Sequence, residues 1–389
     1  MNILVIPSWY ENKNNKTHGS FFREQAKALS ELGHNIYMLY VDIIRFNEVD
    51  RIITTKKYDF YEDEGMKVYR KKVVKIPKTS EVIVANKVRY GIEDLYNKYI
   101  KNSVKIDVIH AHSFIWGGYA GVNISKKFNI PIMVTEHYSG YGRNLFTEEE
   151  KKLISYSMNN CDEIVAVSSG LKDKMNKFTN REIKVIPNIV EERKIIPIDN
   201  GSKKEVFEFL CVAYLREVKG IDILLKAFSE AIKVEPQISL KIGGDGPDRK
   251  FLEELSKKLG ISDKVKFLGA LDREEVFKHM NSCDCFVMTS RHETFGVVYI
   301  EALSQGKPVI ATNNDATQDI INKNNGIVVR KDNIEDTRDA LLYIKDNYNN
   351  YDSYNIIKEC YFRFGKNRIS KVIEKNLLTL INYEKGLIK

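Results

Sequence analysis

Short apolar segments alternate with amphipathic helical segments along most of the chain, and this alternation constrains the fold most. Residues 2–7 (NILVIP) have the composition of a buried strand, and residues 9–20 form a polar stretch after it. Residues 20–32 then keep the 3.6-residue apolar period of a helix that ends at Gly33. A second apolar run at residues 35–41 completes a β-α-β unit, which predicts parallel strands joined by a right-handed crossover.

The alternation recurs in two series. In the first, the predicted strands are DVIHAH, IPIMVTEH, EIVAVS and KVIP; in the second, they are FEFLCVAY, ISLKIGG, VKFLGA, CFVMTS, PVIAT and GIVV. The charged stretch at residues 189–205 indicates a connection between domains. We therefore predict two doubly wound α/β domains, residues 1–190 and 191–364, whose strands end at a common cleft, with a helix at about residues 365–389 returning to the first domain.

Composition narrows the class of protein. With 389 residues, 43% hydrophobic and 29% charged, the chain is long enough for two domains and too apolar to be disordered. It has no apolar run long enough to span a membrane, and its first residues lack the features of a signal peptide, so we expect a cytoplasmic protein. Its five scattered cysteines are expected to be reduced, and the pair Cys283 and Cys285 lies in a strand-like run that does not favour a metal site.

The formal net charge of +8 predicts attraction to anions. Residues 67–89 hold eight basic side chains and one acid, Glu81. Such a stretch can be an ordinary solvated face, or it can hold the chain at the inner face of an anionic membrane. Nucleic acid is not expected as a partner, because no zinc finger, basic zipper or RNP-like aromatic motif accompanies the charge.

The segment RHETFGVVYIEALSQGKPVIAT, residues 291–312, carries the clearest chemical signal. A predicted strand ends before it, Gly296 follows a tight loop, and a helix begins near Val297. Unpaired backbone N–H groups at a helix start can bind a diphosphate. We therefore predict an anion site at Gly296 and Val297.

Glu301 lies in a helix that the sequence predicts to be buried on all sides, so its carboxylate needs a partner. Two ribose hydroxyls or an arginine of the protein would satisfy it, and a partly exposed helix face is the remaining alternative. Glu293 precedes it by eight residues, and both side chains could face one ligand.

Two cations follow an earlier strand, in VAYLREVKGIDILLKAF. Arg216 and Lys219 lie in a loop that Gly220 closes, where they could neutralise charge on a departing phosphate or be solvated loop residues. The turn IGGDGPDR lacks the third glycine of a dinucleotide fingerprint, and no phosphate-binding G-x-x-x-x-G-K motif occurs.

Histidines follow two strands of the first domain. His137 comes at the start of a loop that we expect to face the cleft, although a structural role is the common alternative. His110 and His112 are two residues apart at another strand end, and no carboxylate follows at a ligand spacing that would favour a metal.

Taken in order, these motifs resemble those of family 4 retaining glycosyltransferases of the GT-B fold, of the bacterial kind that builds capsule, exopolysaccharide or lipid-linked oligosaccharide. The resemblance rests on the segments HGSFFREQAKALSELGH, DVIHAH, VTEH, VSSGLKDKM, IKVIPN, VAYLREVKGIDILLKAF, IGGDGP, VKFLGAL and SRHETFGVVYIEALSQGKPVIAT. It covers nearly the whole chain.

The resemblance implies that Glu301 binds the ribose of a nucleotide, Glu293 contacts the donor sugar and Lys219 holds the diphosphate. Gly19 would lie under the phosphates, and His137 would lie beside the transferred sugar, so that His137, Lys219 and Glu293 are the implied catalytic residues. The implied donor-binding residues are Gly19, Arg216, Lys219, Glu293, Thr294, Phe295, Gly296, Val297 and Glu301. Tyr214 stands where the family often has arginine, and whether Arg216 replaces that charge stays open.

The resemblance implies transfer of a sugar from a nucleotide diphosphate, expected to be UDP, to a hydroxyl of a glycan or polyprenyl-linked acceptor in cell-surface polysaccharide synthesis. Retention at the anomeric carbon, a hexosyltransferase type and no metal or cofactor are implied with it. A sugar-nucleotide 2-epimerase of the same fold, or a non-enzymatic protein that binds nucleic acid or other anions, are the alternatives.

Overall fold

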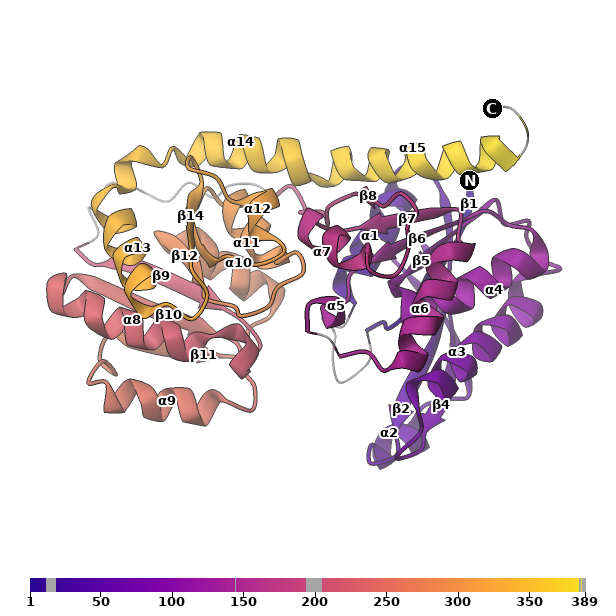
Figure 1. The fold of residues 1–389 in the computed structure, drawn as a ribbon, viewed down its shortest axis with the longest axis horizontal. Coiled ribbons are helices and arrows are strands. Elements are labelled where there is room, and N and C mark those ends of the chain that lie inside the picture. Colours follow the sequence, from indigo (N-terminus) through magenta and orange to yellow (C-terminus); the bar gives the residue numbers. More distant parts are fainter. Residues whose placement is uncertain (12–18, 144, 194–204, 385, 387–389) are drawn as a thin grey trace. The chain divides into compact units, whose positions relative to one another are not determined.

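The computed structural model describes residues 1–11, 19–143, 145–193, 205–384 and 386 (Figure 1). By Cα proximity the chain divides into two compact units. The first comprises Met1–Val167, Leu171–Ile189 and Asn367–Lys389, and the second comprises Ser168–Gly170 and Val190–Lys366. Most of the polar stretch expected after the first strand, with His18, and most of the expected connection between the domains lie outside the described residues.

The first unit is built on an eight-stranded sheet in the order β3-β4-β2-β1-β5-β6-β7-β8. Its strands are β1 (Asn2–Pro7), β2 (Asn35–Arg45), β3 (Tyr58–Asp63), β4 (Met66–Lys75), β5 (Val108–His112), β6 (Ile132–Glu136), β7 (Glu163–Ala166) and β8 (Lys184–Val185). Neighbouring strands are parallel except for β3, which runs antiparallel to β4 at the edge. The strands β1, β5 and β6 are buried along nearly their whole length, which explains why most of their residues are apolar.

Helices join these strands. They are α1 (Ser20–Glu31), α2 (Val49–Thr54), α3 (Glu81–Leu95), α4 (Tyr119–Phe128), α5 (Gly140–Arg143), α6 (Glu148–Asn160) and α7 (Ser169–Met175), with π-helical turns at Tyr96–Ile100 and Ser113–Gly118. Local sequence sets their ends: a capping box between Thr147 and Glu150 starts α6, and Asn129 in the left-handed conformation ends α4.

The last helix, α15 (Lys366–Glu384), belongs to the first unit over most of its length. Its apolar side chains recur every fourth residue at Ile369, Ile373, Leu377 and Ile381, and all four are buried in one core with β1. This spacing places them on one face of the helix, which explains why a segment this rich in charge folds onto the sheet.

The second unit is built on a six-stranded parallel sheet in the order β11-β10-β9-β12-β13-β14. Its strands are β9 (Phe207–Val212), β10 (Ile238–Gly243), β11 (Val265–Gly269), β12 (Cys285–Met288), β13 (Val309–Thr312) and β14 (Gly326–Val329). Its helices are α8 (Ile221–Val234), α9 (Arg249–Lys258), α10 (Arg273–Ser282), α11 (Val297–Ser304), α12 (Thr317–Ile320), α13 (Ile334–Asp346) and α14 (Ser353–Phe364), with 3-10 turns at Glu217–Lys219 and Tyr348–Asn350.

The predicted pair of doubly wound α/β units is confirmed. The second sheet has the order of a dinucleotide-binding fold, and the central strands of the first follow the same order. In such a sheet the strand order reverses at one point, between β1 and β5 in the first unit and between β9 and β12 in the second. Ligands of doubly wound folds bind outside the carboxyl ends of these strands. No helix in the described part of the chain has the length and hydropathy that a membrane span requires.

Candidate functional site

The loops after β9 and β12 meet at the point where the second sheet reverses its strand order. The hydroxyl of Thr289 donates to the carbonyl of Gly220 at 2.8 Å, and the backbone N–H of Arg291 donates to the carbonyl of Val218 at 2.8 Å. These two bonds tie one loop to the other. Side chains on both loops are therefore held in a fixed relation.

Gly220 makes this approach possible. Its φ is 63°, in the left-handed region, and a Cβ added to it would lie 2.1 Å from the carbonyl oxygen of Thr289. Only glycine fits both the conformation and the space. The sequence predicts that Gly220 ends the Lys219 loop. In the structure, the absence of a side chain at Gly220 also lets this loop approach the loop after β12.

Lys219 and Glu293 form the centre of the site. The Lys219 Nζ lies 2.7 Å from a carboxylate oxygen of Glu293, and the two side chains are 23% and 17% exposed. They are packed along most of their length, yet their charged groups stay within reach of a ligand. The sequence predicts each residue separately as part of a donor site, and the structure brings the two into one ion pair.

The start of α11 lies directly after this pair. Gly296 precedes the helix with a φ of 70°, and no side chain among the described residues caps it. A Cβ on Gly296 would lie 2.4 Å from the ring of the fully buried Tyr299. The helix start is therefore open to an anion, and the tyrosine ring beneath it fixes the turn.

Glu301 lies on a half-buried stripe of α11. Val297, Val298 and Glu301 are half-buried, while Tyr299 and Ile300 are fully buried. Residues three and four apart share one helix face. The prediction that this helix is buried on all sides is therefore wrong, because one stripe, which includes the helix start and Glu301, reaches the surface of the unit.

Thr294 and Phe295 turn their side chains inward. The Thr294 side chain is buried, and its carbonyl oxygen accepts a hydrogen bond from the hydroxyl of Ser168 at 2.7 Å. Phe295 is 2% exposed and packs near Phe364. A ligand at the start of α11 could meet these two residues through their backbone only.

Arg216 is exposed on the same loop as Lys219, and its guanidinium lies 5.1 Å from the ring centroid of Tyr214. The cation therefore stacks on the side chain that stands at the family's usual arginine position. This contact holds Arg216 near the ring, and its charge forms no ion pair with a described acid.

The glycine-rich turn after β10 packs against the Lys219 loop. A Cβ on Gly244 would lie 1.8 Å from the carbonyl oxygen of Ala213, and one on Gly246 would lie 2.4 Å from that of Leu215. The glycines are needed for this close packing. The sequence shows the glycines but not the loop against which they pack.

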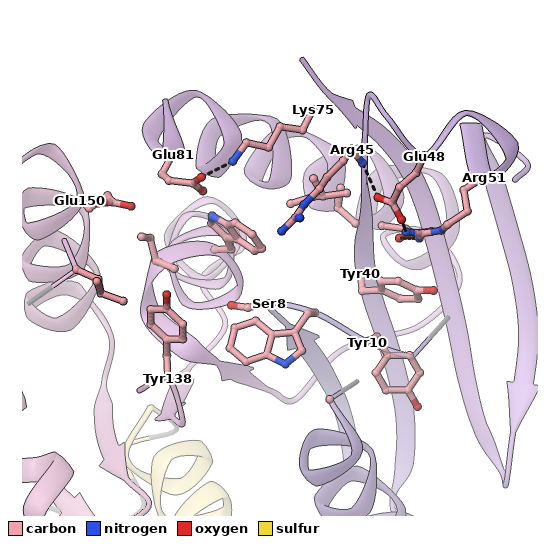
Figure 2. A pocket seen from close by; sticks show the side chains of 18 of the residues that line it. Ser8, Tyr10, Tyr40, Arg45, Glu48, Arg51, Lys75, Glu81, Tyr138 and Glu150 are labelled. Carbon is pink, nitrogen blue, oxygen red and sulfur yellow. Dashed lines mark hydrogen bonds and ion pairs between the residues drawn. The ribbon is translucent and has the colours of Figure 1, made fainter. Parts of the chain in front are cut away.

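The first unit holds a cavity of about 770 Å³ over the carboxyl ends of β1, β2, β5 and β6 (Figure 2). Its lining residues are Ser8, Trp9, Tyr10, Gly19, Phe21, Tyr40, Val41, Asp42, Ile43, Arg45, Glu48, Arg51, Lys75, Glu81, Ile115, Trp116, Tyr138, Leu145, Phe146 and Glu150. Sequence reasoning found only Gly19 among them. Aromatic residues directly after predicted strands, such as Trp9 and Tyr138, were the available signal.

Ion pairs between described pocket residues involve Arg51 and Lys75 but not Arg45. Arg51 lies 2.7 Å from Asp42 and also pairs with Glu48, and Lys75 pairs with Glu81. Within the described residues, the Arg45 guanidinium has no carboxylate within ion-pair distance. Figure 2 shows its side chain extending into the open space of the pocket.

Gly19 stands at the start of α1 with a φ of 77°. A Cβ at this position would lie 2.8 Å from the carbonyl oxygen of Trp9. The glycine thus allows α1 to begin against the segment that follows β1. This contact places Gly19 at the wall of the pocket.

His137 is 7% exposed and belongs to a cluster of three histidines. Its Nε2 lies 3.2 Å from the Nδ1 of His112, and the rings of His110 and His112 lie 4.2 Å apart. Burial lowers the pKa of all three side chains, that of His110 to about 3. The three imidazoles are therefore neutral at physiological pH. Within the described residues, no group of three His, Cys, Asp or Glu side chains could hold a metal ion.

Glu136 is a buried acid that sequence reasoning missed. Its carboxylate accepts hydrogen bonds from the backbone N–H groups of Phe114, His137 and Tyr138 and from the hydroxyl of Tyr141, at 2.8–3.0 Å. Burial raises its pKa, and the backbone donors oppose that rise. Glu136 thus fixes the backbone on both sides of His137, a role that only the position directly before His137 could have suggested.

Two family models match the chain. The model for Glycosyltransferase Family 4 matches residues 18–194, and the model for glycosyl transferases group 1 matches residues 192–359.

Similar proteins were found among curated sequences. An uncharacterized glycosyltransferase of Methanocaldococcus jannaschii is 30% identical over 263 residues, which are 66% of this chain and 72% of that protein. The alpha-monoglucosyldiacylglycerol synthase of Streptococcus pneumoniae is 27% identical over 57% of this chain, and the chain spans only 55% of that synthase.

Solved structures share the fold. Sucrose-phosphate synthase from Thermosynechococcus elongatus has a TM-score of 0.80 at 17% identity, with 98% of this chain and 100% of that chain covered. Anabaena HepE in complex with UDP-glucose has a TM-score of 0.71 at 17% identity, with 97% and 100% covered. Both support the GT-B fold that the sequence predicts. The two family models and the archaeal relative together show that the chain belongs to glycosyltransferase family 4.

Proposed function

We propose that this chain transfers a sugar, with retention at the anomeric carbon, from a nucleotide diphosphate to a hydroxyl group of an acceptor. The observation that carries the proposal is the Lys219–Glu293 ion pair at the carboxyl ends of β9 and β12, next to the uncapped start of α11. A cation, an open helix start and a nearby acid are what an activated sugar with a diphosphate needs.

The donor lies in the second unit in this proposal. Its diphosphate contacts Lys219 and the backbone at Gly296 and Val297, and its ribose contacts Glu301 on the half-buried stripe of α11. The similarity to HepE, whose structure was solved in complex with UDP-glucose, supports a UDP-linked donor for this chain. Glu293 contacts the sugar itself, and Arg216 offers a second positive charge.

The proposed reaction needs no nucleophile from the protein. The acceptor oxygen bonds to the anomeric carbon from the face that the diphosphate leaves, and the bond from that carbon to the phosphate oxygen breaks. The nucleoside diphosphate keeps the electron pair and takes the proton of the acceptor hydroxyl. Lys219 stabilises the charge that develops on the diphosphate, and this contribution is stronger in the transition state than in the ground state.

We place the acceptor in the pocket of the first unit. Its aromatic side chains offer faces on which a sugar ring can pack, and about 770 Å³ is room for a small saccharide. Arg45 supplies a positive charge that pairs with no described acid of the pocket, which favours an acceptor with a phosphate near the sugar. A polyprenyl-linked acceptor in cell-surface polysaccharide synthesis has this chemistry.

Thermal unfolding with a panel of nucleotide diphosphate sugars tests the donor. A ligand present at about 100 times its dissociation constant adds about 2.7 kcal/mol to the free energy of unfolding, so a donor raises the melting temperature measurably. Stabilisation should depend on the base and change little with salt. A shift that ignores the base and disappears steeply with salt would instead indicate general binding of polyanions.

Product analysis separates transfer from epimerisation. The proposal predicts that a labelled sugar moves to an acceptor, whereas release of a free 2-epimer without an acceptor would contradict it. His137 and Gly19 keep the roles that the family resemblance implies as predictions.

A further inference from the structure

Most basic side chains of residues 67–89, the stretch that suggested a membrane surface, form ion pairs or hydrogen bonds within the first unit. Arg70, Lys71 and Lys75 pair with acids, and the ammonium groups of Lys72 and Lys87 donate to backbone carbonyls. These residues belong to β4 and α3, so their charges hold the edge of the sheet together. The surface that fits a bilayer lies beside them.

Large apolar side chains are exposed around α2. We call this surface the α2 tip and define it as residues 45–57 and 72–83, which lie at one end of the first unit (bottom of Figure 1). Its exposed apolar residues are Phe46 (60%), Val49 (56%), Ile53 (75%), Ile76 (58%) and Ile83 (51%). Helix α2 has no buried residue. Packing within the first unit therefore does not explain why this six-residue helix exposes two large aliphatic side chains to water.

The spacing of these residues gathers them on one side. Val49 and Ile53 are four residues apart in α2, which places them on one face of the helix, and Phe46 lies in the turn directly before it. The backbone N–H of Lys72 donates to the carbonyl of Lys57, and its ammonium group donates to the carbonyl of Ile52, so the end of β4 is tied to α2. Ile76 follows directly after that end. These hydrogen bonds therefore fix the backbone segments that carry the exposed apolar side chains.

The charge of the α2 tip fits an anionic lipid surface. It contains seven basic and three acidic residues, a net charge of +4 that is half of the formal charge of the whole chain. Lys56, Lys57 and Lys78 are exposed, whereas the acids Glu48 and Glu81 are paired within the tip. Exposed apolar side chains ringed by lysines are the combination by which a peripheral protein inserts shallowly into anionic lipid.

We infer that the α2 tip docks on an anionic bilayer by inserting Phe46, Val49, Ile53 and Ile76 between the headgroups, with its lysines at the phosphates. The inference stands apart from the proposed transfer reaction. The α2 tip also adjoins the pocket, because Arg45, Glu48 and Lys75 belong both to the tip and to the pocket wall. A docked tip brings the pocket beside the lipid phosphates.

Sedimentation with vesicles of phosphatidylcholine, with and without phosphatidylglycerol, tests this surface. The wild type should sediment with the vesicles that contain phosphatidylglycerol and hardly with the neutral ones. Phe46→Ser combined with Ile53→Ser should weaken binding at least about tenfold, because each inserted methylene contributes. Lys56→Gln combined with Lys57→Gln should weaken it about fivefold for each charge removed.

A matched control uses apolar side chains of similar exposure in the second unit. Val234 is 70% exposed and Phe251 is 56% exposed, so Val234→Ser combined with Phe251→Ser removes similar apolar area elsewhere. This control should bind vesicles as the wild type does. Equal binding by the tip variant and the wild type, or equal loss in the control, would overturn the inference. The inference would also be overturned if the wild type were a dimer that does not bind vesicles and the tip variant were a monomer. A second copy of the chain would then cover the surface.

Fluorescence gives a second measurement that does not depend on removing binding. The emission maximum of the Phe46→Trp variant should shift to shorter wavelength when vesicles with phosphatidylglycerol are added, because the indole enters the headgroup region. Phe251→Trp should show no shift. A Phe46→Trp emission that stays at the wavelength of an exposed indole while the protein is bound would contradict insertion.

Discussion

Lys219 and Glu293, which are 74 residues apart in the chain, meet at 2.7 Å across two loops that are hydrogen-bonded to each other. The pair joins the carboxyl ends of β9 and β12. The ion pair is partly exposed, so a nucleotide diphosphate sugar could separate the two side chains. Lys219 would then contact the phosphate, and Glu293 would contact the sugar. Such a division would give the two residues separate roles that substitution can distinguish.

Replacing Lys219 should affect turnover more than binding. Lys219→Ala should lower kcat by about 10²-fold, because one donor aimed at developing charge contributes that much. Steady-state kinetics with the identified donor measures the effect. Lys226→Ala is the matched control: this lysine lies on α8, 3.9 Å from Asp222, and its loss should leave kcat unchanged. Equal rates in Lys219→Ala and the wild type would rule out the assigned role.

Replacing Glu301 should affect donor binding. Glu301→Ala should raise the dissociation constant of the nucleotide sugar about 10-fold to 100-fold, because a carboxylate that accepts from ribose hydroxyls makes charged hydrogen bonds. Isothermal titration measures this, with the exposed Glu254→Ala on α9 as control. If both variants bind as the wild type does, Glu301 does not contact the nucleotide.

The geometry of Gly220 predicts a difference between two glycines of similar φ. Gly220→Ala meets both an unfavourable φ of 63° and a backbone oxygen at 2.1 Å, whereas Gly260 has a φ of 70° and open space around it. We expect Gly260→Ala to cost about 1–2 kcal/mol and Gly220→Ala about 1–3 kcal/mol more. Thermal unfolding followed by circular dichroism compares them. Equal losses of stability would mean that the two loops do not approach as described.

The buried histidines predict a loss of stability of the first unit in acid. In the unfolded chain His110 titrates near 6.5, but burial lowers its pKa to about 3 in the folded unit. As the pH falls from about 6.5 toward 3, the unfolded state takes up a proton that the folded state does not, so the free energy of unfolding falls by about 1.4 kcal/mol per pH unit for this group.

Tryptophan fluorescence can follow this effect, because both tryptophans, Trp9 and Trp116, lie in the first unit. Urea unfolding at several values between about pH 7 and pH 5 should show a smaller pH dependence for His110→Gln than for the wild type. The raised pKa of Glu136 acts in the opposite direction and is present in both proteins. An unchanged pH dependence in His110→Gln would mean that His110 has the same pKa in the folded unit as in the unfolded chain.

Arg45 predicts how the acceptor pocket responds to charge. Trp9 and Trp116 line the pocket, so their emission should change when a polyprenyl phosphate-linked sugar binds. Arg45→Gln should weaken this binding about tenfold, whereas Arg45→Lys should keep most of it. Arg338→Gln, on an exposed pair with Asp339 in the second unit, should have no effect. Equal affinity in Arg45→Gln would exclude a phosphate contact at this residue.

The fold could be predicted from the sequence because its parallel strands are buried and apolar and its helices keep a clear period. Gly220 and Gly296 likewise mark two helix starts in the sequence, and both are found there with positive φ. Strand β4 was missed because half of its ten residues are basic. They extend along β2 over nine residue pairs, and their charges are satisfied by acids distant in the sequence.

The site could be predicted only in part for the same reason. Sequence spacing indicates that Lys219 and Glu293 follow strands, but the contact between their loops depends on the order of β9 and β12 in the sheet. The half-buried stripe of α11 depends on what packs against the helix, and the identity of its residues alone suggested burial on all sides. The aromatic pocket is formed by segments from several separate regions of the chain, which no local pattern brings together.

Hydrogen–deuterium exchange with and without a stabilising nucleotide diphosphate sugar tests most directly whether the second unit grips the donor at the start of α11. We predict slower exchange at the backbone amides around Gly296 and Val297 and in the Lys219 loop when the ligand is bound, with the Glu301→Ala variant showing less protection at the same ligand concentration. Protection that leaves the start of α11 unchanged, with slower exchange elsewhere in the second unit, would contradict it.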